Sequence, residues 1–216
     1  YLFKGEYLNC SYTGASGSNY EWFTRVLGDR AKIEAEKRGI SFFTVLDEMI
    51  KSIDPAKARA LFCPFVAQPS LHPMAKADFL NIDLNTTYEE LAFSVAEGCA
   101  FIHKYHIDIL KNAGLPLTEV RLTGGTARSK VWNHIFADVL QAPIVGVDCD
   151  ETGALGAALT AGIGAGIYSG YDDAFTKAVK VLDPILPDKS KAEIYEKKYA
   201  DWTLAIESLM NYWENK

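Results

Sequence analysis

The sequence predicts an α/β fold in which a mixed sheet is flanked by helices. Apolar strand-like runs alternate with helical stretches over the second half of the chain, which is typical of this class. Residues 129–140 carry an apolar side chain at every fourth position with others beside them, a stripe wide enough to pack on a sheet. The pair Gly124-Gly125 separates that helix from an apolar run, where a strand-to-helix turn would lie.

An extended segment and a set of helices are expected at the start of the chain. Residues 2–12 are rich in aromatic side chains around Gly5, which predicts a strand or a hairpin. The expected helices cover residues 19–27, 32–38 and 42–52. Gly39 closes the second of them, and Ser41 is placed to cap the third.

The middle of the chain is expected to lead into one long helix. A separate segment over residues 58–66 precedes it, and prolines with little periodicity make residues 68–84 irregular. Thr87 begins the long helix, which extends to about Asn112 and is ended by Gly114.

Strand and helix units fill the rest of the chain. The predicted strands are an apolar run at 120–122 and residues 144–147. A helix runs from Ser129 to Leu140 between them. A helix of small residues over 148–162 permits close packing against a sheet or another helix, and residues 190–211 predict a final amphipathic helix.

Composition limits the classes of function that fit this chain. With 216 residues, of which 49% are hydrophobic, the chain has ample apolar material for a core and is taken as one domain over 1–216. A net charge of −6 disfavours a nucleic-acid surface. No apolar run approaches a membrane span of about 20 residues, and no leader is visible, so we expect a cytoplasmic protein. The chain starts at Tyr1 rather than Met, which we interpret as a piece of a longer protein.

Cysteines and histidines give no pattern typical of a metal site. Four cysteines stand far apart without a Cys-x-x-Cys spacing, so reduced thiols are expected, at Cys10, Cys63, Cys99 and Cys149. His103 and His106 share a helix face, but no third ligand is evident, and no metal-ligating residue is assigned.

The glycine pair is the strongest candidate for a ligand site. Without Cβ atoms, Gly124 and Gly125 let the backbone approach a ligand closely. The helix that starts near Ser129 adds free N–H groups and a positive dipole end, which suit a nucleotide or another anion. Strand–Gly–Gly–helix turns that bind nothing are the alternative. The later run 162–167 is also glycine-rich, but it ends a helix instead of following a strand, so it does not fit a dinucleotide fingerprint.

Three blocks in register resemble the C-terminal domain of the FGGY family of carbohydrate kinases, which share an actin-like, ribonuclease H-like fold. They are residues 122–132, 136–140 and 151–158. Further blocks extend the resemblance over nearly the whole chain, at residues 13–23, at 60–65, which match a strand, and at 97–101, which match a glutamate-glycine element.

The resemblance implies a nucleotide site for ATP, used with Mg²⁺. Gly124 and Gly125 would approach the adenosine and phosphates, and Ser129 would hydrogen-bond the adenine edge. Gly17 and Glu21 would line the opposite side of the cleft. Glu21 is acidic where many members carry a neutral or apolar residue, and an exposed helix residue is the alternative for it.

The catalytic residue is unknown from this sequence. In FGGY kinases a general-base aspartate lies in the N-terminal domain, and the magnesium and sugar ligands lie largely there too. The candidate aspartates of this chain stand in no matching context: Asp78, Asp83, Asp148 and Asp150. We therefore interpret the chain as the ATP-binding half of a sugar kinase, inactive alone.

The sugar is the least determined part of this interpretation. Residues 67–76 keep Pro73 and the Ala75-Lys76 pair of the family, but lack its Gly-Glu-Arg-like triplet. The pattern is nearest to xylulose-type kinases. Kinases for gluconate, a polyol or a signalling sugar stay open, as do a non-catalytic actin-like module and a dinucleotide-binding oxidoreductase domain. The expected partner is a sugar bound together with the missing N-terminal domain, with neither nucleic acid nor membrane. A homodimer stays open.

Overall fold

The computed structural model describes residues 5, 7–14 and 16–216. In the first half of the chain the elements are α1 (Gly17–Leu27), α2 (Asp29–Arg38), α3 (Phe42–Lys51), β1 (Leu61–Cys63), β2 (Asp78–Leu80) and α4 (Tyr88–Asn112). In the second half they are β3 (Val120–Arg121), the 3₁₀ turn η1 (Gly125–Arg128), α5 (Lys130–Leu140), β4 (Ile144–Val145), α6 (Thr152–Gly164), α7 (Tyr171–Ala178), the 3₁₀ turn η2 (Lys189–Lys191) and α8 (Ala192–Glu214). Most of the described chain is therefore helical.

The predicted helix boundaries are confirmed where the sequence carries capping residues. Ser41 accepts a hydrogen bond from the Phe43 amide at the start of α3, and Thr87 accepts one from the Glu90 amide at the start of α4. Gly39 ends α2 in the left-handed conformation, which glycine adopts without steric cost.

The strand or hairpin expected over residues 2–12 is wrong where it can be judged. Residues 7–12 form no regular structure, and residues 2–4 and 6 lie outside the described part of the chain. Tyr7, Leu8 and Tyr12 are 89%, 67% and 71% exposed. No described strand pairs with this segment, so its aromatic pattern finds no neighbouring face to bury against.

Short strands form two separate pairs in the described chain. β1 and β2 are antiparallel, with Leu61 opposite Leu80, so β2 corrects the expectation that residues 68–84 are irregular throughout. β3 and β4 are parallel, and single antiparallel bridges join Ile144 to Ile185 and Val147 to Val181. Both pairings of a mixed sheet are thus present, but the strands are only two or three residues long.

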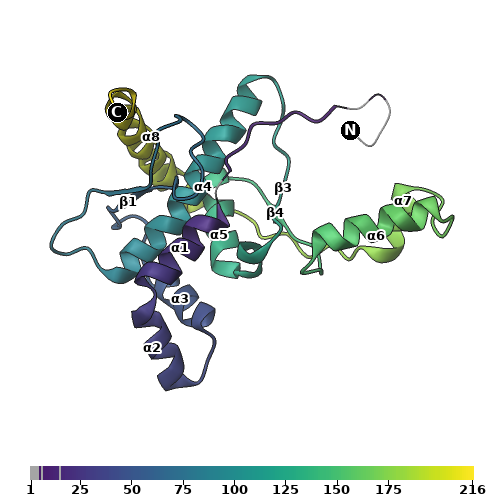
Figure 1. Cartoon of the computed structure of the whole chain (residues 1–216), viewed down its shortest axis with the longest axis horizontal. Helices are drawn as coiled ribbons and strands as arrows, with labels where there is room; N and C mark the ends of the chain where they lie inside the picture. Colours follow the sequence, from purple (N-terminus) through teal and green to yellow (C-terminus); the bar gives the residue numbers. More distant parts are fainter. Residues whose placement is uncertain (1–4, 6, 15) are drawn as a thin grey trace.

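The core is built around α4, which runs through the middle of the molecule and packs against β1, α1, α3, α5 and α8 (Figure 1). Gly98 of α4 lies against the Phe62 carbonyl of β1, where a Cβ atom would overlap it. The same carbonyl accepts a hydrogen bond of 2.9 Å from Trp202 Nε1 of α8. Beside Gly98, the buried Glu97 pairs with Lys198 of α8 at 2.8 Å. The glutamate-glycine element therefore joins α4, β1 and α8.

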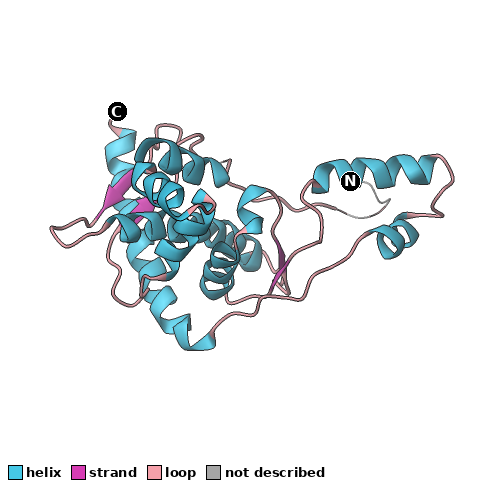
Figure 2. Cartoon of the chain, turned by 90° about the horizontal axis from the view of Figure 1, so that it is seen from below, coloured by secondary structure: helices cyan, strands magenta, loops and turns pink. Residues whose placement is uncertain are grey.

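The small-residue helix lies apart from this core. α6 starts at Thr152 and not at residue 148, and it packs on α7, which the sequence analysis did not anticipate. The two helices project from the body of the molecule in both views (Figure 1, Figure 2). Gly162 is the buried residue of α6, and the rest of this apolar helix is exposed or partly exposed.

None of the described helices is both long enough and apolar enough to cross a membrane. Two tryptophans pack in the core: Trp132 is 1% exposed, and Trp22 stacks with Phe62. All four cysteines are free thiols.

Candidate functional site

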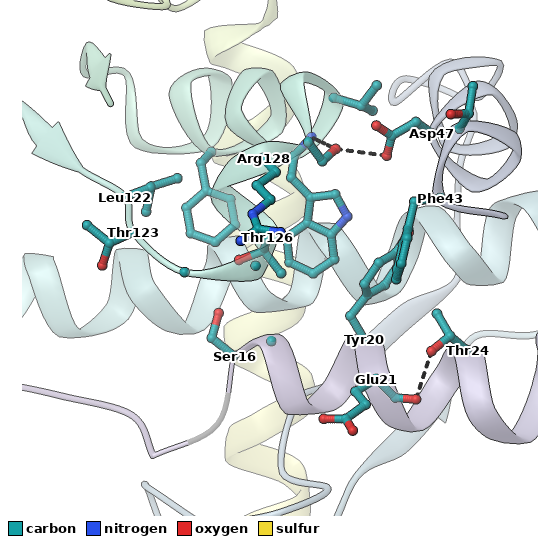
Figure 3. A pocket seen from close by; sticks show the side chains of 18 of the residues that line it. Ser16, Tyr20, Glu21, Thr24, Phe43, Asp47, Leu122, Thr123, Thr126 and Arg128 are labelled. Atoms are coloured by element: carbon teal, nitrogen blue, oxygen red, sulfur yellow. Dashed lines mark hydrogen bonds between the residues drawn. The ribbon is translucent and has the colours of Figure 1, made fainter. Parts of the chain in front are cut away.

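The five residues selected from the sequence line one open cavity of about 1130 Å³. Gly17 and Glu21 reach it from α1, and Gly124, Gly125 and Ser129 reach it from the loop between β3 and α5. Helix α3 forms a third side, which the sequence analysis did not assign to the site. Figure 3 shows the labelled side chains of α1, α3 and the loop around the same space. The structure thus brings all five residues together, although their contact with a nucleotide stays a prediction.

The backbone conformation of the loop explains why Gly124 is a glycine, and the open space around the loop concerns Gly125. Gly124 has φ +90°, a backbone conformation that residues with a Cβ atom rarely adopt. From there the chain enters the 3₁₀ turn, in which the Ala127 amide donates to the Gly124 carbonyl at 3.2 Å. A Cβ atom built on Gly125 would meet no atom within 4 Å, so this glycine borders open space. The loop therefore presents bare backbone at the cavity.

The start of α1 lies close to this loop. A Cβ atom on Gly17 would stand 3.6 Å from Thr126 Cγ2, an ordinary van der Waals contact. The cavity is accordingly narrow where Gly17 faces the loop. Glu21, one turn further along α1, is exposed at the cavity. It is thus both an exposed helix residue and a lining residue, the two alternatives considered for it.

The Ser129 hydroxyl forms two hydrogen bonds within the protein, which the sequence alone does not indicate. As the N-cap of α5, its hydroxyl oxygen accepts a hydrogen bond from the Trp132 amide at 3.1 Å. The same hydroxyl donates to Asp47 Oδ1 of α3 at 2.8 Å. Its donor is therefore used within the protein, and contact with a base edge would involve Asp47 as well.

Asp47 is the main residue that the sequence analysis missed. It lines the cavity from α3, and partial burial raises the pKa of its carboxyl group, while the hydrogen bond from Ser129 acts in the opposite direction. Its spacing of four residues from Phe43 places both side chains on one face of α3, but only the structure shows that this face lines the cavity.

Aromatic rings form the apolar side of the cavity. Tyr20 is nearly buried and meets Trp132 edge-on, with ring centroids 4.8 Å apart. Phe43 lies 6.4 Å from Tyr20 and is 60% exposed, so its ring is open to a ligand. Deeper in, His103 packs on Phe136, and burial lowers the pKa of His103 to about 4, which keeps the imidazole neutral near pH 7.

Among the described residues, three cationic ones line the cavity: Arg121 and Arg128 on the side of the glycine loop, and Lys51 at the end of α3. Arg128 reaches Asp150 at 3.1 Å and Glu151 at 3.8 Å, and Arg121 pairs with Glu119 at 2.7 Å. Both guanidinium groups are about half exposed and can exchange these carboxylates for another anion at little cost.

The aspartates considered in the sequence do not lie at this cavity. The candidate aspartates Asp78, Asp83, Asp148 and Asp150 all lie outside the lining of the 1130 Å³ cavity. Within the described residues, no three His, Cys, Asp or Glu side chains are grouped so that they could hold a metal ion. The arrangement accommodates a ligand with an aromatic and an anionic part, and the titratable side chains in its lining include Glu21, Asp47 and His103.

Comparisons with known proteins agree with this arrangement. The model of the "FGGY family of carbohydrate kinases, C-terminal domain" matches residues 3–165. The chain is 27% identical over 212 residues to the L-xylulose/3-keto-L-gulonate kinase of Escherichia coli strain K12, covering 98% of this chain and 40% of the relative. It is 26% identical over 193 residues to the autoinducer-2 kinase of Yersinia pestis bv. Antiqua strain Angola, covering 87% of this chain and 36% of the relative.

Solved structures share the fold. The xylulose kinase from Rhodospirillum rubrum superposes with a TM-score of 0.78 at 28% identity, over 92% of this chain and 39% of that one. The glycerol kinase of Plasmodium falciparum with ADP gives a TM-score of 0.68 at 20% identity, over 89% of this chain and 37% of that one. The expected actin-like, ribonuclease H-like class is confirmed.

The chain spans 40% or less of the length of these curated relatives. The family match nevertheless covers most of its residues, and it includes the α1 segment, α3 and the glycine loop that surround the cavity. The chain therefore belongs to the FGGY family of carbohydrate kinases and corresponds to the C-terminal domain of its members.

Proposed function

We propose that this chain is the nucleotide-binding domain of a kinase that transfers the γ-phosphoryl group of ATP, with Mg²⁺, to a hydroxyl group of a sugar. One observation carries the proposal: Gly17, Glu21, Gly124, Gly125 and Ser129, selected from two distant parts of the sequence, line a single cavity. A pocket of this size accommodates a nucleotide.

The cavity has the groups that a nucleotide needs. Phosphoryl transfer depends on positioning and on neutralised charge more than on covalent chemistry by the protein. Bare backbone at Gly124 and Gly125 suits phosphates, with Arg128 on the same side. The exposed Phe43 ring suits stacking against a base. By family resemblance, the general-base aspartate and the Mg²⁺ ligands belong to the N-terminal domain, which this chain does not include.

A pentulose such as xylulose is our proposed acceptor. The support is that relatives and solved structures similar to this chain are named as xylulose-type kinases. Others are named as kinases of autoinducer-2 and gluconate, and these acceptors are the alternatives. The choice depends on residues outside this chain, because the cavity described above takes the nucleotide.

The test is Gly125→Val in the full-length polypeptide. A Cβ atom at this position meets nothing within 4 Å, so the fold should hold while a branched side chain enters the path of the phosphates. We expect KM for ATP to rise by at least about tenfold, equivalent to a loss of about 1.4 kcal/mol of binding. KM for the sugar and the melting temperature should change little.

Gly170→Val is the matched control. Gly170 precedes α7, its backbone is fully extended, and a Cβ atom there also meets nothing within 4 Å. This variant should keep the ATP requirement of the wild type. An unchanged KM for ATP in Gly125→Val would remove the glycine loop from the nucleotide site.

A further inference from the structure

The cavity contains a carboxylate that has no cationic partner. Among the described residues, no Lys, Arg or His nitrogen lies within the 4.0 Å of an ion pair from the Asp47 carboxylate, although it is partly buried. Its neighbour Glu48 in α3, by contrast, pairs with Arg38 at 2.6 Å. A desolvated acceptor without a counter-charge favours a ligand that brings hydrogen-bond donors.

The surroundings of Asp47 favour a planar donor. Phe43 precedes it by one helical turn on the same face, and its ring is open to the cavity. Ser129 fixes the carboxylate by donating to Oδ1 at 2.8 Å, while its own hydroxyl is held as the N-cap of α5. The carboxylate is therefore fixed in place beside an aromatic surface (Figure 3).

The negative charge of Asp47 also determines which end of a nucleotide lies next to it. Phosphates would be repelled by Asp47, whereas Arg128 would attract them and the bare backbone of Gly124 and Gly125 leaves room for them in the same cavity. The base then lies between Phe43 and the Asp47–Ser129 pair.

We propose that Asp47, held in position by Ser129, accepts a hydrogen bond from the 6-amino group of adenine and so makes the site selective for ATP over nucleotides with a 6-oxo base. This inference rests on the proposed nucleotide site and adds a specificity-determining residue to it. An ionised carboxylate only accepts hydrogen bonds, so it attracts an amino group and repels the 6-oxo group of hypoxanthine or guanine.

The existing hydrogen bond also disfavours guanine in another orientation. Guanine can donate from N1 and from its 2-amino group side by side, which requires both carboxylate oxygens to point at the base. In this site Oδ1 already accepts the Ser129 hydroxyl. One remaining oxygen matches the single amino group of adenine.

The experiment compares ATP with inosine triphosphate in the full-length polypeptide. The two nucleotides differ at position 6 of the base, and inosine also carries a hydrogen at N1. The wild type should prefer ATP in kcat/KM by about tenfold to a hundredfold, the effect of one hydrogen bond to a charged group. In Asp47→Asn the amide can donate to the 6-oxo group, so the preference should fall at least about tenfold or invert.

Asp172→Asn is the matched control, because Asp172 is exposed on α7 and away from the cavity. It should leave the ATP preference unchanged. Calorimetric Kd values for both nucleotides, measured alongside the rates, separate base recognition from an effect on the chemical step.

A purely structural role of Asp47 makes a different prediction. If Asp47 only joined α3 to α5, Asp47→Asn would lower stability and leave the ratio between the nucleotides unchanged, which would overturn the proposal. A wild type that uses both nucleotides equally would overturn it too, without needing any variant to fold. A wild type that binds neither would instead refute the nucleotide site itself.

Discussion

At the residue scale, the buried pair Glu97–Lys198 shows how a polar element is accommodated in the core. Glu97 is fully buried, and burial raises its pKa to about 7 although Lys198 acts to lower it. Lys198 Nζ lies 2.8 Å from the carboxylate and 3.2 Å from the Ala58 carbonyl. The pair thus links α4 and α8 to the segment before β1, and either charge alone would be costly in this place.

Lys198→Met should destabilise the protein more as the pH rises. Without the ammonium group, the pKa of Glu97 in the folded state lies further above its unfolded value of about 4.3. A raised folded-state pKa favours folding at pH below the unfolded value, and this contribution is lost as the pH rises through the folded value. We expect a loss of about 3 kcal/mol at pH 8 and a clearly smaller loss at pH 5, measured by urea unfolding.

The double variant Glu97→Gln with Lys198→Met is the control for this effect. It removes the titrating carboxyl group, so the part of the stability difference between pH 5 and pH 8 that Glu97 causes should disappear. A pH-independent loss in Lys198→Met alone would show that the lysine contributes packing and not charge compensation.

At the scale of elements, capping residues made much of the helical structure predictable, and the strands could not be placed as well. Ser41, Thr87 and Ser129 all cap helices in the structure. β2 was missed because its three residues, Asp78–Leu80, follow a proline-containing segment and form a strand only through pairing with β1. Local sequence contains little of that non-local information.

The same limit applies to the candidate site. The glycine loop and α1 were found because their residues match a family pattern in consecutive positions. Asp47 belongs to a helix whose apolar face is expected in any α/β protein, and its role becomes visible only when Ser129 lies 2.8 Å away. A contact between residues 82 positions apart cannot be read from spacing in the sequence.

Ser129→Ala should weaken α5 and loosen α3 together. It removes the cap of α5 and the hydrogen bond to Asp47, so we expect a loss of about 1–2 kcal/mol in the free energy of unfolding. Ser129→Gly also removes the hydrogen bond to Asp47 but is a better N-cap than alanine, and should cost less.

Thr87→Ala is the matched control, because Thr87 caps α4 in the same way and does not line the cavity. It should cost about 1 kcal/mol and leave nucleotide affinity unchanged. Equal stability of Ser129→Ala and the wild type would contradict the role assigned to this hydroxyl.

At the scale of the whole molecule, the chain consists of a well-packed body and a projecting pair of helices. α6 is apolar on every side and mostly exposed, whereas an all-round apolar helix is normally buried. In the 216-residue chain studied alone, amide hydrogens of α6 and α7 should exchange much faster than those of Val95 to Ile102 in α4, which are buried. Equal protection in both regions would contradict this division.

Calorimetric titration with Mg-ATP, ADP and NAD tests the central claim most directly. It should be performed on the full-length polypeptide and repeated with Gly125→Val, whose new side chain enters the cavity without meeting a protein atom within 4 Å. We predict that ATP and ADP bind, that NAD does not, and that Gly125→Val weakens both adenine nucleotides at least about tenfold. Binding of NAD, or no binding of ATP and ADP to the wild type, would contradict the assignment of this cavity as the nucleotide site of a carbohydrate kinase.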